Sequence, residues 1–264
     1  GTKQSLYIAI RHYKWFSDSW FEEVGADSLE ATTFHKFLLA ADSPATGYVG
    51  SGVAPGRILN QFSMSEYEGD LRVATTSGQV FQGATNGISV LRMQDGGLEV
   101  IGQVSGLAPG EDIRSVRFSG PLGFIVTFKK TDPLYVIDLA DPEDPKVEGE
   151  LKIPGFSTYM HFMDPGHILS IGYDADDQGS FAWFTGIMLQ VFDVTDITDP
   201  KLLHKEVIGT RGTTSDAATN HLAFNYFKPK DLLALPMVVC EESDGGGSYG
   251  EVMSFSGLML YDVT

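Results

Sequence analysis

Several oxygen-bearing side chains crowd one short stretch of this chain, D-A-D-D-Q-G. A calcium-binding loop opens with oxygen ligands at alternate positions and then a glycine, because a hard cation takes several oxygen ligands while the chain turns sharply. The candidate ligands here are Asp174, Asp176, Asp177 and Gln178. The match is partial, since glutamine replaces an acidic residue and Thr185 stands where such a loop has its glutamate. The stretch predicts either a calcium site completed by other loops or water, or a solvated acidic loop.

Large aromatic side chains are the second candidate for function. The tryptophans are Trp15, Trp20 and Trp183. Tryptophan supplies a large, stiff contact surface with a polar N–H, which is typical of sites that dock sugars or proteins. The alternative is that these side chains fold inward and form small cores beneath their own loops.

No linear motif identifies a catalytic pair. Residues 245–250 match G-x-G-x-x-G and residues 246–250 match G-x-S-x-G, but both motifs require a helix to follow, and a strand-like segment follows here. Catalysis needs a nucleophile or an acid–base pair with supporting groups. The main hypothesis is therefore a non-catalytic binding module for protein or carbohydrate. The alternative is a calcium-dependent hydrolase or lyase with an active site at the mouth of a central channel, assembled from several segments of the chain.

Composition excludes some partners. The 264 residues include 18 basic and 35 acidic side chains, which gives a net charge of −17. Such a charge repels nucleic acid and anionic lipid. The longest apolar run, L-L-A-L-P-M-V-V-C, is far shorter than the about 20 residues needed to cross a bilayer, so this segment is not expected to insert into a membrane. A single cysteine, Cys240, excludes an intrachain disulfide.

A repeated hairpin indicates how these residues are positioned. V-I-D-L-A-D-P-E-D-P-K-V at 136–147 and V-F-D-V-T-D-I-T-D-P-K-L at 191–202 have nearly the same pattern. Each begins as a buried strand, continues into Asp- and Pro-rich text typical of turns, and resumes at a Pro-Lys pair, where a proline suits the start of an edge strand. The hairpin therefore leads from an inner strand to an outer one.

Other landmarks recur at a similar interval. Glycines that end short loops occur at 56, 110, 155 and 209, and each is followed by an expected strand centred on Phe62, Phe118, Phe162 or Phe224. A unit of four strands repeated every 40–50 residues is typical of a propeller blade, whereas a β-sandwich shows no such repeat. We predict one all-β propeller domain over residues 1–264. It holds about five blades' worth of chain, and the first blade lacks its innermost strand and the last its outermost.

Three strings carry a family resemblance: G-R-I-L-N-Q-F-S-M-S-E-Y-E-G-D-L-R-V-A-T-T-S-G (56–78), G-L-A-P-G-E-D-I-R-S-V-R-F (106–118) and D-P-L-Y-V-I-D-L-A-D-P-E-D-P-K-V-E-G-E-L-K-I-P-G-F (132–156). Through them the chain resembles the secreted bacterial and archaeal proteins with a C-terminal β-propeller domain, which are distantly related to WD-repeat propellers. The resemblance implies an exported protein, periplasmic or at the cell surface, with further sequence N-terminal to this piece. It implies no particular activity.

The propeller prediction places the candidate residues in two groups. Long loops at 11–31, 77–85, 174–185 and 240–255 are expected on one face, and they carry the tryptophans and the acidic stretch; long loops on a rigid scaffold are common binding sites. The second group lies in the innermost strands and consists of Asn60, Arg114, Arg117, His161 and His221. This row predicts either a ligand site at the channel mouth or a polar plug satisfied by water.

Overall fold

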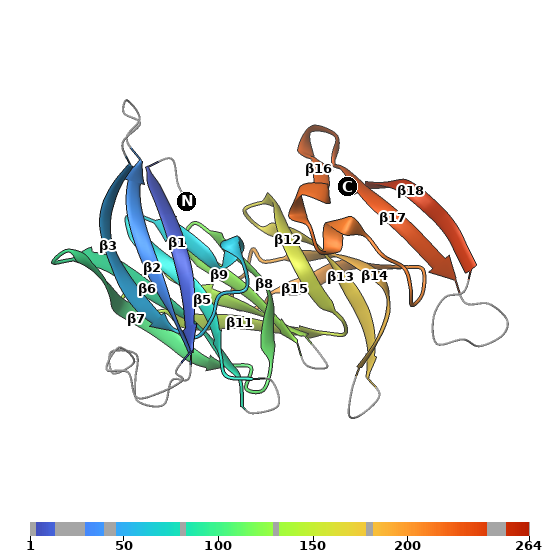
Figure 1. Cartoon of the computed structure of the whole chain (residues 1–264). Coiled ribbons are helices and arrows are strands. Elements are labelled where there is room, and N and C mark those ends of the chain that lie inside the picture. The colour runs from blue at the N-terminus through green and yellow to red at the C-terminus, as the bar shows by residue number, and fades with distance from the viewer. Residues whose placement is uncertain are drawn as a thin grey trace. The chain divides into compact units, whose positions relative to one another are not determined.

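The computed structural model describes residues 4–13, 30–39, 46–79, 83–128, 132–177, 182–241 and 252–263. Within these ranges the regular elements are β-strands and short 3-10 helices, and the strands form five sheets (Figure 1). Every strand pair whose register is described is antiparallel. No helix in this described part of the chain is long and apolar enough to cross a bilayer.

The sheets follow one another along the sequence. Sheet 1 holds β1 (Ser5–Tyr13), β2 (Glu30–Leu39) and β3 (Thr46–Pro55), and sheet 2 holds β4 (Met64–Tyr67), β5 (Asp70–Ser77), β6 (Thr85–Gln94) and β7 (Gly97–Leu107). Sheet 3 holds β8 (Asp112–Ser119), β9 (Leu122–Phe128), β10 (Asp132–Asp138) and β11 (Lys146–Ile153). Sheet 4 holds β12 (Phe156–Asp164), β13 (His167–Asp177), β14 (Ala182–Asp193) and β15 (Lys201–Ile208), and sheet 5 holds β16 (Asn225–Phe227), β17 (Leu232–Glu241) and β18 (Val252–Asp262).

This succession confirms the prediction of four-stranded antiparallel blades. Three sheets of four strands stand between two sheets of three, as expected for about five blades' worth of chain. Two expected strand centres were wrong. Phe62 lies in the 3-10 helix η2 (Gln61–Ser63), and Phe224 is the C-cap of the 3-10 helix η5 (His221–Ala223). In both cases an asparagine side chain caps the helix, since Asn60 accepts a hydrogen bond from the Phe62 N–H and Asn220 accepts one from the Leu222 N–H.

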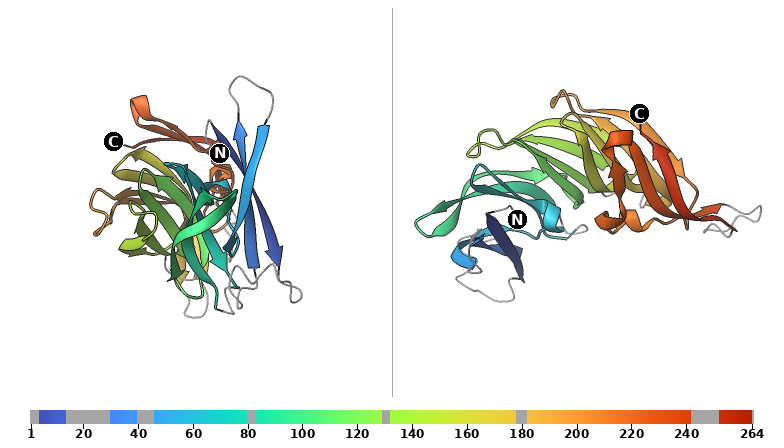
Figure 2. Two further views of the ribbon diagram at one scale, coloured as in Figure 1. Left: turned by 90° about the vertical axis from the view of Figure 1, so that its left-hand side faces the viewer. Right: turned by 90° about the horizontal axis from the view of Figure 1, so that it is seen from above.

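The chain divides into two compact units. The first comprises Gly1–Ile125 and Val136–Glu148, and the second comprises Val126–Tyr135 and Gly149–Thr264. In the first unit, one core cluster joins sheets 1 and 2, with Phe34 of β2, Leu71 and Val73 of β5, and Leu91 of β6 fully buried. The left-hand view of Figure 2 shows the three strands of sheet 1, in blue, side by side.

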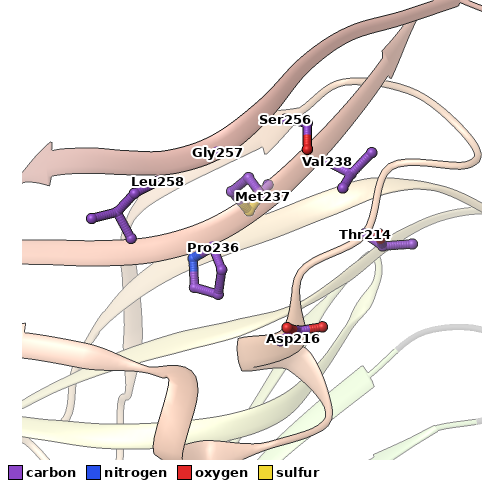
Figure 3. A pocket seen from close by; sticks show the side chains of 8 residues that line it. All are labelled: Thr214, Asp216, Pro236, Met237, Val238, Ser256, Gly257 and Leu258. Atoms are coloured by element: carbon purple, nitrogen blue, oxygen red, sulfur yellow. The ribbon is translucent and has the colours of Figure 1, made fainter.

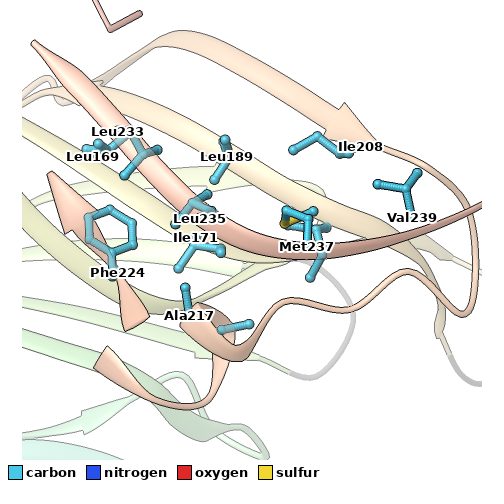
Figure 4. Close-up of a cluster of buried hydrophobic side chains, with 12 residues drawn as sticks. Leu169, Ile171, Leu189, Ile208, Ala217, Phe224, Leu233, Leu235, Met237 and Val239 are labelled. Carbon is cyan, nitrogen blue, oxygen red and sulfur yellow. The ribbon is translucent and has the colours of Figure 1, made fainter. Parts of the chain in front are cut away.

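The core of the second unit lies between sheets 4 and 5. Figure 4 shows Ile171 and Leu189 of sheet 4 facing Leu235 and Met237 of β17. The 3-10 helix η4 (Asp216–Ala218) adds Ala217, which is fully buried in this cluster. Alternate residues of β17 enter the core because successive side chains of a strand point to opposite faces.

Candidate functional site

Four aromatic rings gather at the end of sheet 4 where β13 ends and β14 begins. Phe128 comes from the end of β9, Phe156 from the start of β12, Tyr173 from β13 and Phe184 from β14. The ring centroids of Phe128 and Phe156 lie 4.5 Å apart, and Phe184 packs edge-on against Phe156 at 5.1 Å. Tyr173 lies 5.6 Å from Phe156 and 6.2 Å from Phe184. We call these four residues the loop-end aromatic cluster.

Strand register explains why these rings meet. Phe156 is paired with Tyr173 across β12 and β13, and Phe184 is paired with Ala175 across β13 and β14. Directly before β12 stands Gly155, whose φ is +92°. A side chain at Gly155 would also meet the Tyr173 carbonyl and the Met188 sulfur, so glycine is required for the chain to enter β12 this close to β13.

The cluster is buried at its base and open at one ring. Phe128 and Phe156 are buried, whereas 44% of Phe184 is exposed. Burial also raises the pKa of the Tyr173 hydroxyl above its ordinary value. Three rings therefore support a fourth whose surface is available to a ligand.

Polar groups border the cluster. Asp174 follows Tyr173 and sits at an irregularity in the β13–β14 register, where a strand re-aims its side chains. One oxygen of its carboxylate accepts a hydrogen bond from the Thr185 hydroxyl at 3.1 Å, and the other accepts one from Lys205 Nζ at 2.6 Å. Lys205 also donates to the Pro154 carbonyl at 3.4 Å. An exposed aromatic surface next to donors and acceptors can bind a ligand with both apolar and hydroxyl-bearing faces.

Asp174 is the member of the predicted calcium stretch whose side chain the structure describes. The backbones of Asp176 and Asp177 extend β13 and pair with Trp183 and Ala182, so the loop predicted over 174–185 is shorter than expected. Gln178 lies outside the described residues. In the described part of the chain, no three His, Cys, Asp or Glu side chains are grouped to hold a metal. Calcium binding by this stretch stays a prediction.

Of the three tryptophans predicted to form a binding surface, the structure places only one. Trp15 and Trp20 lie outside the described residues, and Trp183 is placed in β14 directly before Phe184. Sequence reasoning missed the loop-end aromatic cluster because three of its members are ordinary strand residues far apart in the chain. The signal that was available is the aromatic-rich string S-F-A-W-F, which ends at Phe184.

The predicted row of innermost polar residues is divided between the two units, with three residues in the first and two in the second. In the first unit, Asn60 binds the Phe62 N–H, and the Arg117 guanidinium stacks on the Phe62 ring, 3.4 Å from its centroid. Arg114 lies in β8 three residues before Arg117. These contacts anchor η2 against β8.

In the second unit, His161 and His221 share a group of aromatic neighbours. The His161 ring lies 5.7 Å from Phe224 and 5.5 Å from Tyr226, while the His221 ring stacks on Tyr159 at 6.3 Å. Tyr159 in turn lies 5.0 Å from Phe224. Both histidines are half-buried. Whether the row forms a ligand site or a polar plug stays a prediction.

A separate hollow of about 350 Å³ lies against sheet 5 (Figure 3). Pro236, Val238 and Leu258 supply its apolar lining, and Thr214, Asp216 and Ser256 supply polar groups. Among the described residues that line it, there is no aromatic ring and no ion pair, so this lining offers a ligand fewer orienting contacts than the loop-end aromatic cluster does.

Comparison with known proteins agrees with the repeated four-stranded sheets. A family model described as "Beta propeller domain" matches residues 1–264. The chain belongs to this family. The β-propeller domain is 38% identical over 216 residues to an uncharacterised protein of Archaeoglobus fulgidus, a match that covers 82% of this chain and 31% of that protein. It is 46% identical over 159 residues to the uncharacterised protein MJ1554 of Methanocaldococcus jannaschii, covering 60% of this chain and 24% of that protein. The chain thus spans less than a third of the length of either relative.

Proposed function

We propose that this β-propeller domain is a non-catalytic binding module that acts outside the cytoplasm. The ligand binds at the loop-end aromatic cluster, and its chemical class is carbohydrate. The observation that carries the proposal is Phe184, an aromatic side chain that is 44% exposed although three other rings support it. The location outside the cytoplasm rests on the resemblance to exported propeller proteins.

The chemistry beside Phe184 favours a sugar over other ligands. A pyranose presents an apolar C–H face that can stack on an aromatic ring such as Phe184, and its hydroxyls can hydrogen-bond polar side chains of the neighbouring strand ends, where Asp174 lies. A net charge of −17 disfavours nucleic acid and other polyanions. A protein ligand would use the same exposed ring as an anchor, so the experiment includes peptides.

A glycan and peptide array probed with the intact chain tests the proposal. We expect binding to glycans, and we expect Phe184→Ala to weaken it at least about tenfold, since an exposed aromatic anchor contributes roughly 1.5 kcal/mol or more. Phe227→Ala is the matched control, because Phe227 is a phenylalanine of the same unit that is 53% exposed and lies outside the cluster. Binding to peptides alone would replace carbohydrate by protein as the ligand class. Equal loss in both variants, or no loss in either, would refute the site.

A further inference from the structure

The turn of the β12–β13 hairpin holds an Asp-Pro bond whose aspartate contacts a histidine (β12 and β13 are labelled in Figure 1). Asp164 is paired with His167, and Pro165 and Gly166 form the turn between them. The Gly166 N–H donates to Asp164 Oδ1 at 2.8 Å. His167 Nδ1 lies 2.9 Å from Oδ1 and 3.0 Å from Oδ2 of the same carboxylate. One short turn therefore brings together a carboxylate, an imidazole and a peptide bond to proline.

Proline gives this turn a different shape from other two-residue turns of the chain. In two of those turns both residues have positive φ, which matches the twist of the flanking strands; they are Glu68-Gly69 and Asp95-Gly96. The ring of Pro165 fixes φ near −65°, and Gly166 does not adopt the left-handed conformation. The strand register also shifts between Phe162 and Asp164. Side-chain hydrogen bonds to the Asp164 carboxylate close this hairpin instead.

Other Asp-Pro bonds of the chain have different surroundings. They follow Asp132, Asp141, Asp144 and Asp199. The described carboxylates of the last three bind, respectively, the Glu143 N–H at 3.0 Å, Lys146 at 2.6 Å and Lys201 at 3.3 Å. An imidazolium is a stronger acid than a lysine ammonium by about four pKa units. Among the Asp-Pro bonds whose aspartate side chain is described, Asp164–Pro165 is therefore the one with an effective proton donor beside it.

The charges around this turn define a pH range. Although partial burial opposes its charge, hydrogen bonds from His167 and the Gly166 N–H lower the pKa of the Asp164 carboxyl. Histidine gains its proton as pH falls from neutral to mildly acidic. Mild acid therefore combines an ionised carboxylate with an imidazolium. The other charged or titratable groups around the pair are Asp193 of β14, Lys201 of β15, and Tyr226 and Lys228 beside β17.

We propose that the Asp164–Pro165 bond is a self-cleavage site that acts in mild acid, with Asp164 as the nucleophile and His167 as the proton donor. Asp164 Oδ2 attacks the carbonyl carbon of its own residue, and a five-membered cyclic anhydride forms. The bond from this carbon to the Pro165 nitrogen breaks, and its electron pair goes to the nitrogen. The His167 imidazolium gives this nitrogen its proton, so proline leaves as a secondary amine.

Water completes the reaction. One water molecule opens the anhydride, which leaves the side-chain carboxylate and a new terminal carboxylate on Asp164. Opening the anhydride releases protons, one of which returns to His167. The side chains of His167 and Asp164 are 35% and 42% exposed, so water reaches the turn. The net change is hydrolysis of one peptide bond without an external catalyst.

The cleaved chain keeps its strand pairing. His161 is paired with Leu169 and Phe162 with Ile168 on the two sides of the turn, and these contacts do not need the Asp164–Pro165 bond. Fragments 1–164 and 165–264 therefore stay together under native conditions. Since the step does not involve Phe184, it is independent of the proposed carbohydrate site.

Intact-mass spectrometry of the full chain under denaturing conditions tests the proposal after incubation at about pH 5 and at about pH 8. We expect fragments 1–164 and 165–264 at the lower pH, and slower cleavage at the higher pH and after Asp141, Asp144 and Asp199. His167→Gln should slow the cleavage by about tenfold or more. His204→Gln, which changes an exposed histidine of the same unit, is the matched control and should leave the rate unchanged.

Three results would overturn the proposal: an intact chain at the lower pH, equal cleavage at every Asp-Pro bond, or equal rates for His167→Gln and the unaltered chain. Hydroxylamine separates self-cleavage from the action of a contaminating protease, because it attacks an anhydride. Fragment 1–164 formed in its presence should therefore carry the mass of a hydroxamate. Fragment 1–164 that forms only as the free acid would also overturn the proposal.

Discussion

Lys36 Nζ lies 2.8 Å from Glu66 Oε1, and the two side chains are only 9% and 12% exposed. The same oxygen accepts hydrogen bonds from the Tyr7 hydroxyl at 2.9 Å and from the Ser5 hydroxyl at 3.2 Å. Lys36 and Tyr7 belong to sheet 1 and Glu66 to sheet 2, so one buried carboxylate joins two neighbouring blades. Such a network is stable only while each charge has its partner.

Removal of the Glu66 carboxylate should destabilise the folded chain strongly. We expect Glu66→Ala to lower the free energy of unfolding by about 3–5 kcal/mol, because Lys36 is left as a buried charge without its partner. Urea unfolding measures the change. Glu99→Ala, at an exposed position of β7, should change stability by less than about 0.5 kcal/mol. Replacement of both charges, Lys36→Met with Glu66→Leu, should recover much of the loss; failure of the double variant to do so would contradict a buried-charge penalty.

Alkaline pH should weaken the same contact. Burial raises the pKa of Tyr7 from 10.0 to about 12 in the folded chain. The unfolded state therefore loses this proton first, and the free energy of unfolding falls as pH rises from about 10 to about 12. Although burial opposes its charge, hydrogen bonds to Glu66 and Tyr7 raise the pKa of Lys36, whose contribution is lost in the same direction. Tyr7→Phe should flatten the pH dependence of urea midpoints in this range, and an unchanged slope would contradict the assignment.

Substitution of Lys205 tests the hypothesis that residues 174–178 bind calcium. The Lys205 ammonium occupies one oxygen of Asp174, so a calcium ion bound at 174–178 would compete with it. If the stretch binds calcium, Lys205→Met should enlarge the rise in Tm that calcium produces, and Asp174→Asn should remove it. Thermal melts with calcium and with chelator measure both. Identical melts for the unaltered chain and the Lys205→Met variant under the two conditions would end the hypothesis.

Gly102 of β7 lies so close to the turn of sheet 3 that we expect no larger residue to fit at this position without loss of stability. In Gly102→Ala the added methyl would clash with the backbone around Pro142 and Glu143, and we expect a loss of about 1–3 kcal/mol in the free energy of unfolding. Gly47→Ala is the matched control, since nothing lies within 4 Å of a Cβ at that strand position. The control should be neutral or slightly stabilising. Equal effects of the two substitutions would show that the turn of sheet 3 does not press on β7.

Local sequence was sufficient to predict the repeating four-stranded unit. The Asp- and Pro-rich turns after Asp138 and Asp193 form as predicted, because an aspartate side chain binds the N–H two residues further on without help from tertiary structure. Antiparallel four-stranded sheets follow from such turns together with apolar strands. The expected strand centres at Phe62 and Phe224 failed for the same local reason, since the preceding asparagines cap 3-10 helices.

Only the tertiary structure revealed the loop-end aromatic cluster and the buried Lys36–Glu66 pair. Phe128, Phe156 and Phe184 are far apart in the chain, and each reads as an ordinary strand residue. Their proximity depends on how one strand end packs against the next, which no short-range pattern specifies. The sequence by itself determined the blade, because the period of strands and turns is local. Only the folded chain determined the candidate site, because contacts between blades bring together residues that are far apart in the sequence.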